Sequence, residues 1–371
     1  MRAGAIAASV LIGCGFSPHA VDDGHTNPPD DALRDARPDV SRDAWLPGYL
    51  YRKAITVTPQ LAAPLADFPL GLVRAMDHDL MAHAHADDYA VTADDAVTPL
   101  EVEHVLSMGG NLELWVRVPM LQPGPQTFYL YYGGPDTPSL RSMWAAATGV
   151  WHLSEGGPTL HDSSPIPHDL SQQNGNQTPM PKPGVAGNAR GYDGQDDSLG
   201  IADRADGTLD EGMRSFSFSM WLKVMMPSTS FETPFWKGGT STGEPGFCVV
   251  TGNEYWNVKI HDGTSYVDPE LGTAAALAGN WVHVAGVVDR GTNQFSAYAN
   301  GAFHQMLAIS IGSLDNSFAF DIGRAGTGVF KGLVDEVRIY PDVRSADWIK
   351  TEHANLADPA FLQFSPETPK P

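Results

Sequence analysis

Two neighbouring carboxylates, Asp335 and Glu336, stand in the middle of a stretch that alternates as a β-strand does. In residues 330–340, Asp335 shares one face with Val337 and Ile339, and Glu336 falls on the other face. A carboxylate inside a sheet is unusual, because its burial without a partner or a metal ion is unfavourable. The alternation predicts that the two side chains point to opposite faces, so they cannot act together on one bond.

Known catalytic patterns find little support in this sequence. Residues 239–243 satisfy Gly-x-Ser-x-Gly, in which a nucleophilic serine needs a sharp turn between a strand and a helix. The flanking segments, 235–238 and 247–250, read as two strands and indicate an ordinary loop. A glycosidase needs two carboxylates at a set separation, and the spacing Glu-x-Asp-x-x-Glu does not occur. Histidines within residues 77–85 lack a second ligand group of comparable spacing, which favours a solvated loop over a zinc site.

Composition sets the fold class and excludes some partners. The chain has 371 residues with 38 Gly and 29 Pro, and stretches of helical period are scarce, which predicts an all-β protein with many turns. The formal net charge of −21 argues against nucleic acid, which requires basic patches, and against electrostatic docking on anionic lipid. Neutral glycans and divalent cations remain compatible with this charge.

The elements that would carry the acidic pair are β-strands. Residues 281–289 and 294–299 read as two strands, and the following Asn300-Gly301 is a strong hairpin signal. Residues 112–118 alternate as a half-buried strand, and residues 128–132 form another.

Ordered motifs over about 190 residues resemble the laminin-G-like (concanavalin A-like) jelly-roll family. The matching segments are residues 151–155, 187–194, 215–223, 281–289 and 330–340. The resemblance implies a jelly roll over residues 146–343. It also implies a domain that binds glycan or protein far more often than it catalyses a reaction.

The same resemblance implies a calcium site, because the opening and closing strands of this family lie side by side. Glu155 and Asp335 are then expected to converge, with Asp162 or Asp193 and nearby carbonyl oxygens completing a shell of oxygen ligands. The alternative is that Glu336 pairs with Arg338 or Lys331, that Asp335 accepts backbone N–H bonds, and that no metal binds.

Glycan recognition would use aromatic faces stacked on sugar rings, with polar side chains bonding the hydroxyl groups. Aromatic residues in or beside expected loops are the candidates for this contact: Trp236, Tyr255, Trp256 and Tyr266. Burial in the core of the jelly roll is the alternative for each of them.

The N-terminus resembles a bacterial lipoprotein signal. A short apolar run leads to Leu11-Ile12-Gly13-Cys14, and residues 1–14 are identified as the signal with its lipobox. The resemblance implies cleavage before Cys14, acylation there, and an exported protein anchored at the outer membrane. Residues 15–44, rich in Asp and Pro, predict a disordered acidic tether. Cys248, in an apolar run, is expected to be a buried small hydrophobe.

Residues 45–142 resemble a bacterial domain of unknown function that often precedes laminin-G-like modules. The segments that match are residues 51–57, 67–70, 98–103, 114–119 and 129–134. That family carries no activity to this chain. Residues 344–371 predict a short helix capped by Ser345, followed by a tail that is expected to fray.

The sequence therefore predicts an all-β chain of two antiparallel β-sandwich domains, the second a concanavalin A-like jelly roll, with a short C-terminal helix. The expected function is non-catalytic binding of extracellular glycan or of a surface protein. The alternatives are a structural or adhesion scaffold of the outer membrane and, third, a polysaccharide-active enzyme.

Overall fold

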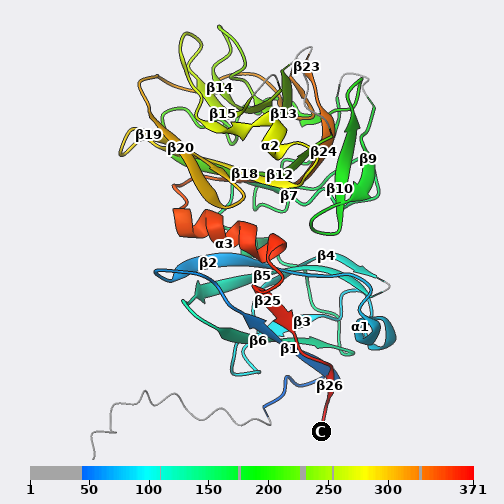
Figure 1. The fold of residues 1–371 in the computed structure, drawn as a ribbon. Coiled ribbons are helices and arrows are strands. Elements are labelled where there is room, and N and C mark those ends of the chain that lie inside the picture. The colour runs from blue at the N-terminus through cyan, green and yellow to red at the C-terminus, as the bar shows by residue number, and fades with distance from the viewer. Residues whose placement is uncertain (1–43, 109, 174–176, 226–230, 253–254, 326–327) are drawn as a thin grey trace, which may run out of the picture. The chain divides into compact units, whose positions relative to one another are not determined.

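The computed structural model describes residues 44–108, 110–173, 177–225, 231–252, 255–325 and 328–371, and Asp43–Pro371 form one compact unit (Figure 1). Antiparallel sheets dominate this unit, which confirms the predicted all-β class of two β-sandwiches with a C-terminal helix. Cys14, the predicted signal and the predicted tether up to residue 43 lie outside the described residues.

The first sandwich packs a sheet of order β25-β1-β6-β3, with β26 also beside β1, against a sheet of order β2-β5-β4. Apolar side chains from both sheets share one buried core, including Ile55, Phe68, Leu114 and Leu130. Its elements within residues 44–144 are β1 (Tyr51–Val57), β2 (Leu65–Arg74), α1 (His78–His83), β3 (Ala90–Thr92), β4 (Val102–Met108), β5 (Asn111–Leu121), β6 (Gln126–Tyr132) and the 3-10 helix η1 (Arg141–Trp144).

The second sandwich is the predicted jelly roll. In the described part of the chain, one sheet has the order β20-β19-β18-β12-β24-β10-β9, with β7 beside β24, and the other has the order β16-β15-β14-β13-β21-β11-β8, with β17 beside β15. The elements of its first half are β7 (Gly149–Trp151), β8 (Ser171–Gln172), β9 (Met180–Pro183), β10 (Asn188–Asp193), β11 (Leu199–Ile201), β12 (Phe216–Val224), β13 (Glu232–Lys237), β14 (Gly246–Thr251) and β15 (Tyr255–His261). Those of its second half are β16 (Tyr266–Val267), β17 (Glu270–Thr273), α2 (Ala274–Leu277), β18 (Val282–Asp289), β19 (Gln294–Ala299), β20 (Ala302–Ala308), β21 (Phe320–Ile322), the small β22–β23 pair (Arg324–Ala325, Gly328–Val329) and β24 (Lys331–Tyr340).

Local signals in the sequence placed several of these elements correctly. The opening strand β7 pairs with the closing strand β24, with Trp151 opposite Val337. Asn300 and Gly301 both adopt positive φ, 51° and 72°, as the predicted tight hairpin between β19 and β20 requires.

The C-terminal helix α3 (Ala346–Ala357) begins as predicted, because the Ser345 hydroxyl accepts a hydrogen bond from the Trp348 N–H at 3.1 Å. Trp348 and Ile349 are buried. None of the described helices is long or apolar enough to cross a lipid bilayer.

The prediction that the tail frays is wrong. Strands β25 (Leu362–Phe364) and β26 (Thr368–Pro369) both pair with β1, and Phe361 is buried. The tail supplies hydrogen bonds that β1 would otherwise lack at the edge of its sheet. The first sandwich is therefore built from both ends of the described chain, and the jelly roll is inserted between them (Figure 1).

The prediction that Asp335 and Glu336 face opposite ways is also wrong. Between β12 and β24, Ser219 lies opposite Arg338 while Trp221 lies opposite Asp335, so β24 contains one extra residue. Glu336 takes a left-handed φ of 49° at this β-bulge. The bulge resets the alternation, so Val334, Val337 and Ile339 face the jelly-roll core and both carboxylates lie on the other side.

Candidate functional site

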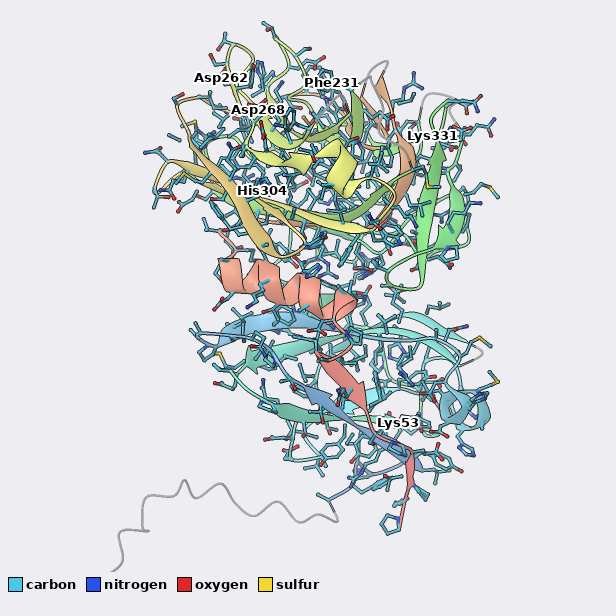
Figure 2. The ribbon with its side chains drawn as sticks, in the orientation of Figure 1. Lys53, Phe231, Asp262, Asp268, His304 and Lys331 are labelled. Carbon is cyan, nitrogen blue, oxygen red and sulfur yellow. The ribbon has the colours of Figure 1, made fainter. Side chains whose placement is uncertain are left out.

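A groove of about 370 Å³ lies over the outer face of the sheet that contains β13, β14 and β15. In β15, Trp256, Val258 and Ile260 pack into the core, so the intervening Asn257 and Lys259 point away from it. The residues of the groove that offer an aromatic face or a polar side chain are Phe231, Thr233, Thr240, Asn257, Lys259, Tyr266 and Asp268. Figure 2 labels Phe231 and Asp268 on the jelly roll.

Two exposed aromatic rings border this groove. Phe231 and Tyr266 are 65% and 56% exposed, which is unusual for side chains of their size. The Lys259 ammonium lies 4.3 Å from the centre of the Tyr266 ring and donates to the Thr240 carbonyl at 3.1 Å. The cation–π contact holds the ring beside the groove.

The turn that presents Tyr266 is fixed by Asp262. One carboxylate oxygen accepts the N–H groups of Thr264 and Ser265, both at 2.8 Å, and the other accepts the Gly312 N–H at 2.9 Å. These bonds lower the pKa of Asp262 below its usual range, so the carboxylate stays charged and the turn stays bonded.

Polar groups that line the groove can meet a hydroxylated ligand. The Asn257 side-chain amide donates to the Asp268 carbonyl at 3.1 Å, which fixes its orientation. Burial raises the pKa of the Asp268 carboxyl, and the nearby Lys259 charge partly opposes that rise. An ammonium, an amide, a carboxyl and aromatic faces together offer hydrogen-bond donors, acceptors and a stacking surface.

The predicted aromatic contacts divide into exposed and buried residues. Tyr266 borders the groove, and Tyr255 is exposed at the start of β15 but is not part of the groove lining. Trp236 and Trp256 are only 8% and 1% exposed, so their assignment as a sugar platform is wrong. Trp236 lies in β13 and packs against Phe318, and Trp256 lies in β15 and joins the core.

Phe231 was missed by sequence reasoning. Its signal is an aromatic residue directly after the polar run Pro227-Ser228-Thr229-Ser230. Such a position marks a residue entering a strand, and the exposed fraction of its side chain could not be inferred from that pattern.

The four predicted calcium ligands are not brought together. Each accepts hydrogen bonds in its own surroundings: Glu155 from the His161 N–H, Asp162 from the N–H groups of Val150, Ser164 and His168, Asp193 from the Gln195 N–H, and Asp335 from the N–H groups of Val185 and Ala186. The sequence left open the alternative that Asp335 accepts backbone N–H bonds and that Glu336 pairs with Arg338 or Lys331. Both contacts of Asp335 and the pairing of Glu336 with Arg338 at 2.6 Å are present. Calcium binding itself stays a prediction.

Potential ligand atoms do gather in two other groups among the described residues. Asp193 lies with Asp196 and Asp197 near the surface, and their oxygen atoms are within 4.8 Å of one another. Glu113, His152 and Glu336 form the second group, which is fully buried. We interpret this second group as a hydrogen-bonded network, because the Arg338 guanidinium already contacts Glu336 and Ser154 donates to Glu113.

The Gly-x-Ser-x-Gly segment forms the loop between β13 and β14, as predicted. Gly239 and Gly243 both have positive φ, 88° and 87°, and the loop leads into a strand. A nucleophilic serine at this pattern requires a following helix, so this segment does not present one.

Comparison with known proteins supports the assignment of the second sandwich. Residues 193–350 match a family model described as the concanavalin A-like lectin/glucanases superfamily. No curated protein matches the sequence.

Several solved binding domains are similar to part of this chain. The binding domain of Paraclostridial Mosquitocidal Protein 1 shares 12% identity, covers 56% of this chain and 52% of its own, and gives a TM-score of 0.47. The binding domain of Botulinum Neurotoxin DC is similar in two complexes: with SialylT (12% identity, 57% and 52% coverage, TM-score 0.46) and with rat synaptotagmin II (12%, 59% and 53%, 0.47). The chain thus spans about half the length of these structures.

Proposed function

We propose that this chain is a non-catalytic binding protein that holds an extracellular glycan in the groove beside Tyr266. The observation that carries the proposal is the exposed Tyr266 ring next to Lys259 and Asp268. A sugar hydroxyl donates and accepts at once, so it can accept from the ammonium and donate to the carboxyl while the ring covers the apolar face of the sugar. The match of residues 193–350 to a family model that includes lectins supports this class of ligand.

The charge of the chain favours a neutral glycan over a polyanionic one. The formal net charge is −21, and the groove contains both an ammonium and a carboxyl group. A strongly anionic polymer would be repelled at long range. We further propose that the predicted lipobox at Cys14 keeps the groove outside the cell.

Glycan-array binding followed by calorimetry tests this function. We expect Tyr266→Ala to weaken binding about tenfold, which corresponds to about 1.4 kcal/mol for one lost stacking contact. Phe303→Ala is the matched control, because Phe303 is an equally exposed aromatic residue on β20, outside the groove. Equal loss in both variants would contradict the groove as the binding site.

A scaffold without a glycan ligand is the second candidate. Strand β20 forms one edge of its sheet in the described chain, with Phe303 and Met306 exposed and no carboxylate, Lys or Arg within Ala302–Ala308. Sheet edges without charge can add a strand from another protein. The scaffold is favoured if no glycan on the array gives a binding signal and the wild-type chain captures a surface protein.

A further inference from the structure

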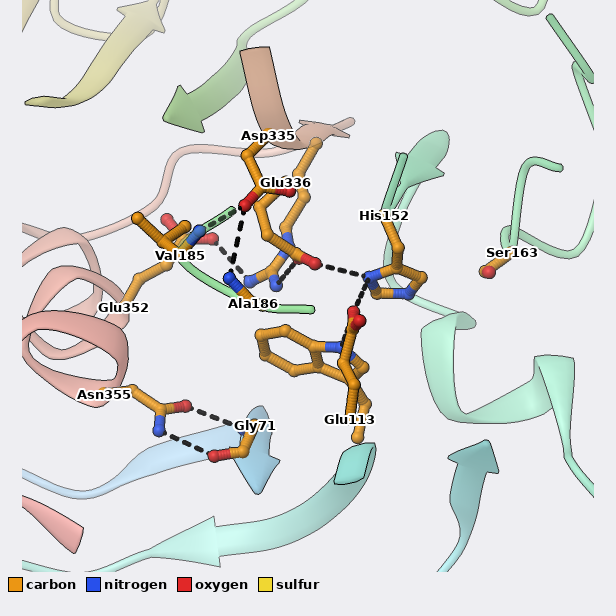
Figure 3. Close-up of polar contacts among 12 residues, drawn as sticks. Gly71, Glu113, His152, Ser163, Val185, Ala186, Asp335, Glu336, Glu352 and Asn355 are labelled. Carbon is orange, nitrogen blue, oxygen red and sulfur yellow. Dashed lines mark hydrogen bonds and ion pairs between the residues drawn. The ribbon is translucent and has the colours of Figure 1, made fainter. Parts of the chain in front are cut away.

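The interface between the two sandwiches buries an unusual set of charged groups. We call this interface the joint; its apolar part includes Trp115 and Trp144 from the first sandwich and Ala186, Val287 and Tyr340 from the jelly roll. Figure 3 shows that the polar contacts at its centre come from both sandwiches and from α3. Because these groups are removed from water, each charge must be balanced locally.

His152 lies at the centre of the joint, directly after β7. Its Nδ1 is 2.9 Å from Glu336 Oε1, and its Nε2 is 3.2 Å from Glu103 Oε2 on β4 (Figure 3 shows the first contact). The imidazole stacks on Trp115 at 5.4 Å. Burial opposes charge on this ring, but Glu336 and Glu103 outweigh burial and raise the pKa of His152 well above its ordinary value.

Arg338 supplies the other buried positive charge. It donates to Glu336 at 2.6 Å and to Glu352 of α3 at 2.9 Å. Its guanidinium carbon lies 4.2 Å from the centre of the Trp115 ring. Arg338 therefore connects the closing strand of the jelly roll, the C-terminal helix and the first sandwich.

Glu113 of β5 has no cation of its own. Its Oε2 accepts the Ser154 hydroxyl at 2.7 Å, and its Oε1 lies 3.8 Å from His152 Nδ1, which Glu336 already engages at 2.9 Å. The Glu113 side chain is completely buried, and one of its oxygen atoms lies within 4.8 Å of an oxygen atom of Glu336. Two carboxylates facing each other in a dry site repel unless one is protonated.

A loop of the jelly roll depends on this centre. The Asp335 carboxylate accepts the N–H groups of Val185 and Ala186 at 2.7 Å and 3.2 Å (Figure 3). Glu113 reaches the same loop, because a Cβ at Gly187 would overlap Glu113 Oε2. A charge that appears on Glu113 thus acts directly on the contact between the sandwiches.

We propose that the joint is a proton-dependent lock, in which Glu113 must carry a proton opposite Glu336 for the two sandwiches to stay closed on each other. The titratable and charged groups that face this centre come from every element packed on it: Glu103 of β4, Glu113 of β5, His152 after β7, His283 of β18, Asp335, Glu336, Arg338 and Tyr340 of β24, and Glu352 and His353 of α3.

The directions of the pKa shifts agree with this lock. Burial and then the charge of Glu336 raise the pKa of Glu113 to about 8. Burial, Glu336 and Glu113 likewise raise that of Asp335 well above its usual range. Burial opposes ionisation of Glu336, Glu103 and Glu352, but neighbouring cations and donors outweigh it and lower the pKa of each.

The pH window follows from Glu113. Its pKa is about 8 in the closed joint and has its ordinary value of 4.5 when exposed, so the closed state binds one extra proton between these values. Protonation of Glu113 therefore favours closure at low pH, and the contribution of this group to the opening equilibrium constant rises about tenfold per pH unit from about pH 5 to about pH 8, then levels off. Asp335 and His152, whose pKa values are also raised in the closed joint, weaken closure in the same direction as pH rises above their ordinary pKa values of 3.8 and 6.5. The carboxylates of lowered pKa act only in acid.

The test compares the wild-type chain with Glu113→Gln, which has nearly the same shape and cannot ionise. Hydrogen exchange of β5 and residues 184–188, corrected for the intrinsic pH dependence of exchange, should rise in the wild type across pH 5 to 8. In Glu113→Gln, the opening equilibrium constant should rise about tenfold less per pH unit than in the wild type, because the variant lacks one titrating proton. Ser154→Ala is the matched control, because it removes a hydrogen bond to Glu113 and should shift the whole curve while keeping its slope.

A second measurement does not depend on the variant folding. The infrared carbonyl band of protonated, buried carboxyl groups in the wild type should lose intensity near pH 8. Identical pH slopes for wild type and Glu113→Gln, or an infrared band that is unchanged between pH 6 and pH 9, would overturn the lock.

Discussion

The two outer faces of the jelly roll both present polar side chains away from the core, but one face is open and the other is covered. On β15, Asn257 and Lys259 point away from the core and border an open groove. On β24, Glu336 and Arg338 also point away from the core, yet each is only 2% exposed because the first sandwich covers them. An outward position on a strand is therefore not a surface position. Where another layer covers the face, its charges must pair, as they do in the joint.

Removing one charge from the covered face should produce the largest loss of folding stability. We expect Arg338→Ala to lower the free energy of unfolding by about 4 kcal/mol, because Glu336 and Glu352 would remain buried without their partner. Arg117→Ala is the matched control: Arg117 also pairs with two carboxylates but is partly exposed, so a loss of about 0–1 kcal/mol is expected. Denaturant unfolding measures both, and equal losses would break the contrast between covered and open faces.

Two aromatic residues on the paired strands β15 and β16 sharpen the same contrast. Trp256→Ala should destabilise the jelly roll by about 3 kcal/mol, since Trp256 is 1% exposed in the core. Tyr266→Ala should change stability by less than about 0.5 kcal/mol, because its ring is mostly in solvent. Thermal and denaturant unfolding of the two variants decides this, and an unstable Tyr266→Ala protein would show that Tyr266 has a structural role.

Calcium should have the smallest effect on folding stability. The predicted ligands Glu155, Asp162 and Asp335 each accept other hydrogen bonds, and only Asp193 lies in a group of carboxylates. If this group near the surface binds calcium with a dissociation constant near 1 mM, then 1 mM calcium adds about 0.4 kcal/mol of stability. The melting temperature with and without chelator measures it, and Asp193→Asn should abolish the difference. A large fall on chelation would show a tight site elsewhere.

Elements with strong local signals could be predicted from the sequence. The strand over residues 331–340, the Asn300-Gly301 hairpin and the Ser345 cap each rest on a few adjacent residues, and the structure confirms all three. The pairing of Glu336 with Arg338 was also among the sequence alternatives, because both belong to one strand.

The candidate site was predicted only in part. Tyr266 was expected to contact a ligand and does border the groove, whereas Trp256 was expected in or beside a loop and is buried in the core, which was the stated alternative. Strand ends are set by cross-strand pairing with distant residues, here β14 and β17, and that pairing has no local signal.

Composition and alternation by themselves determined that this chain folds into antiparallel sheets, because turn residues and period-two patterns act within a few positions. Tertiary structure alone decided which faces are covered. Residues 112–118 read as half-buried, yet Glu113 and Trp115 are 0% and 1% exposed because the jelly roll packs on them. The bulge at Glu336 and the pairing of β25 and β26 with β1 are equally non-local. They depend on contacts between segments far apart in the chain, whose energies no short stretch of sequence contains.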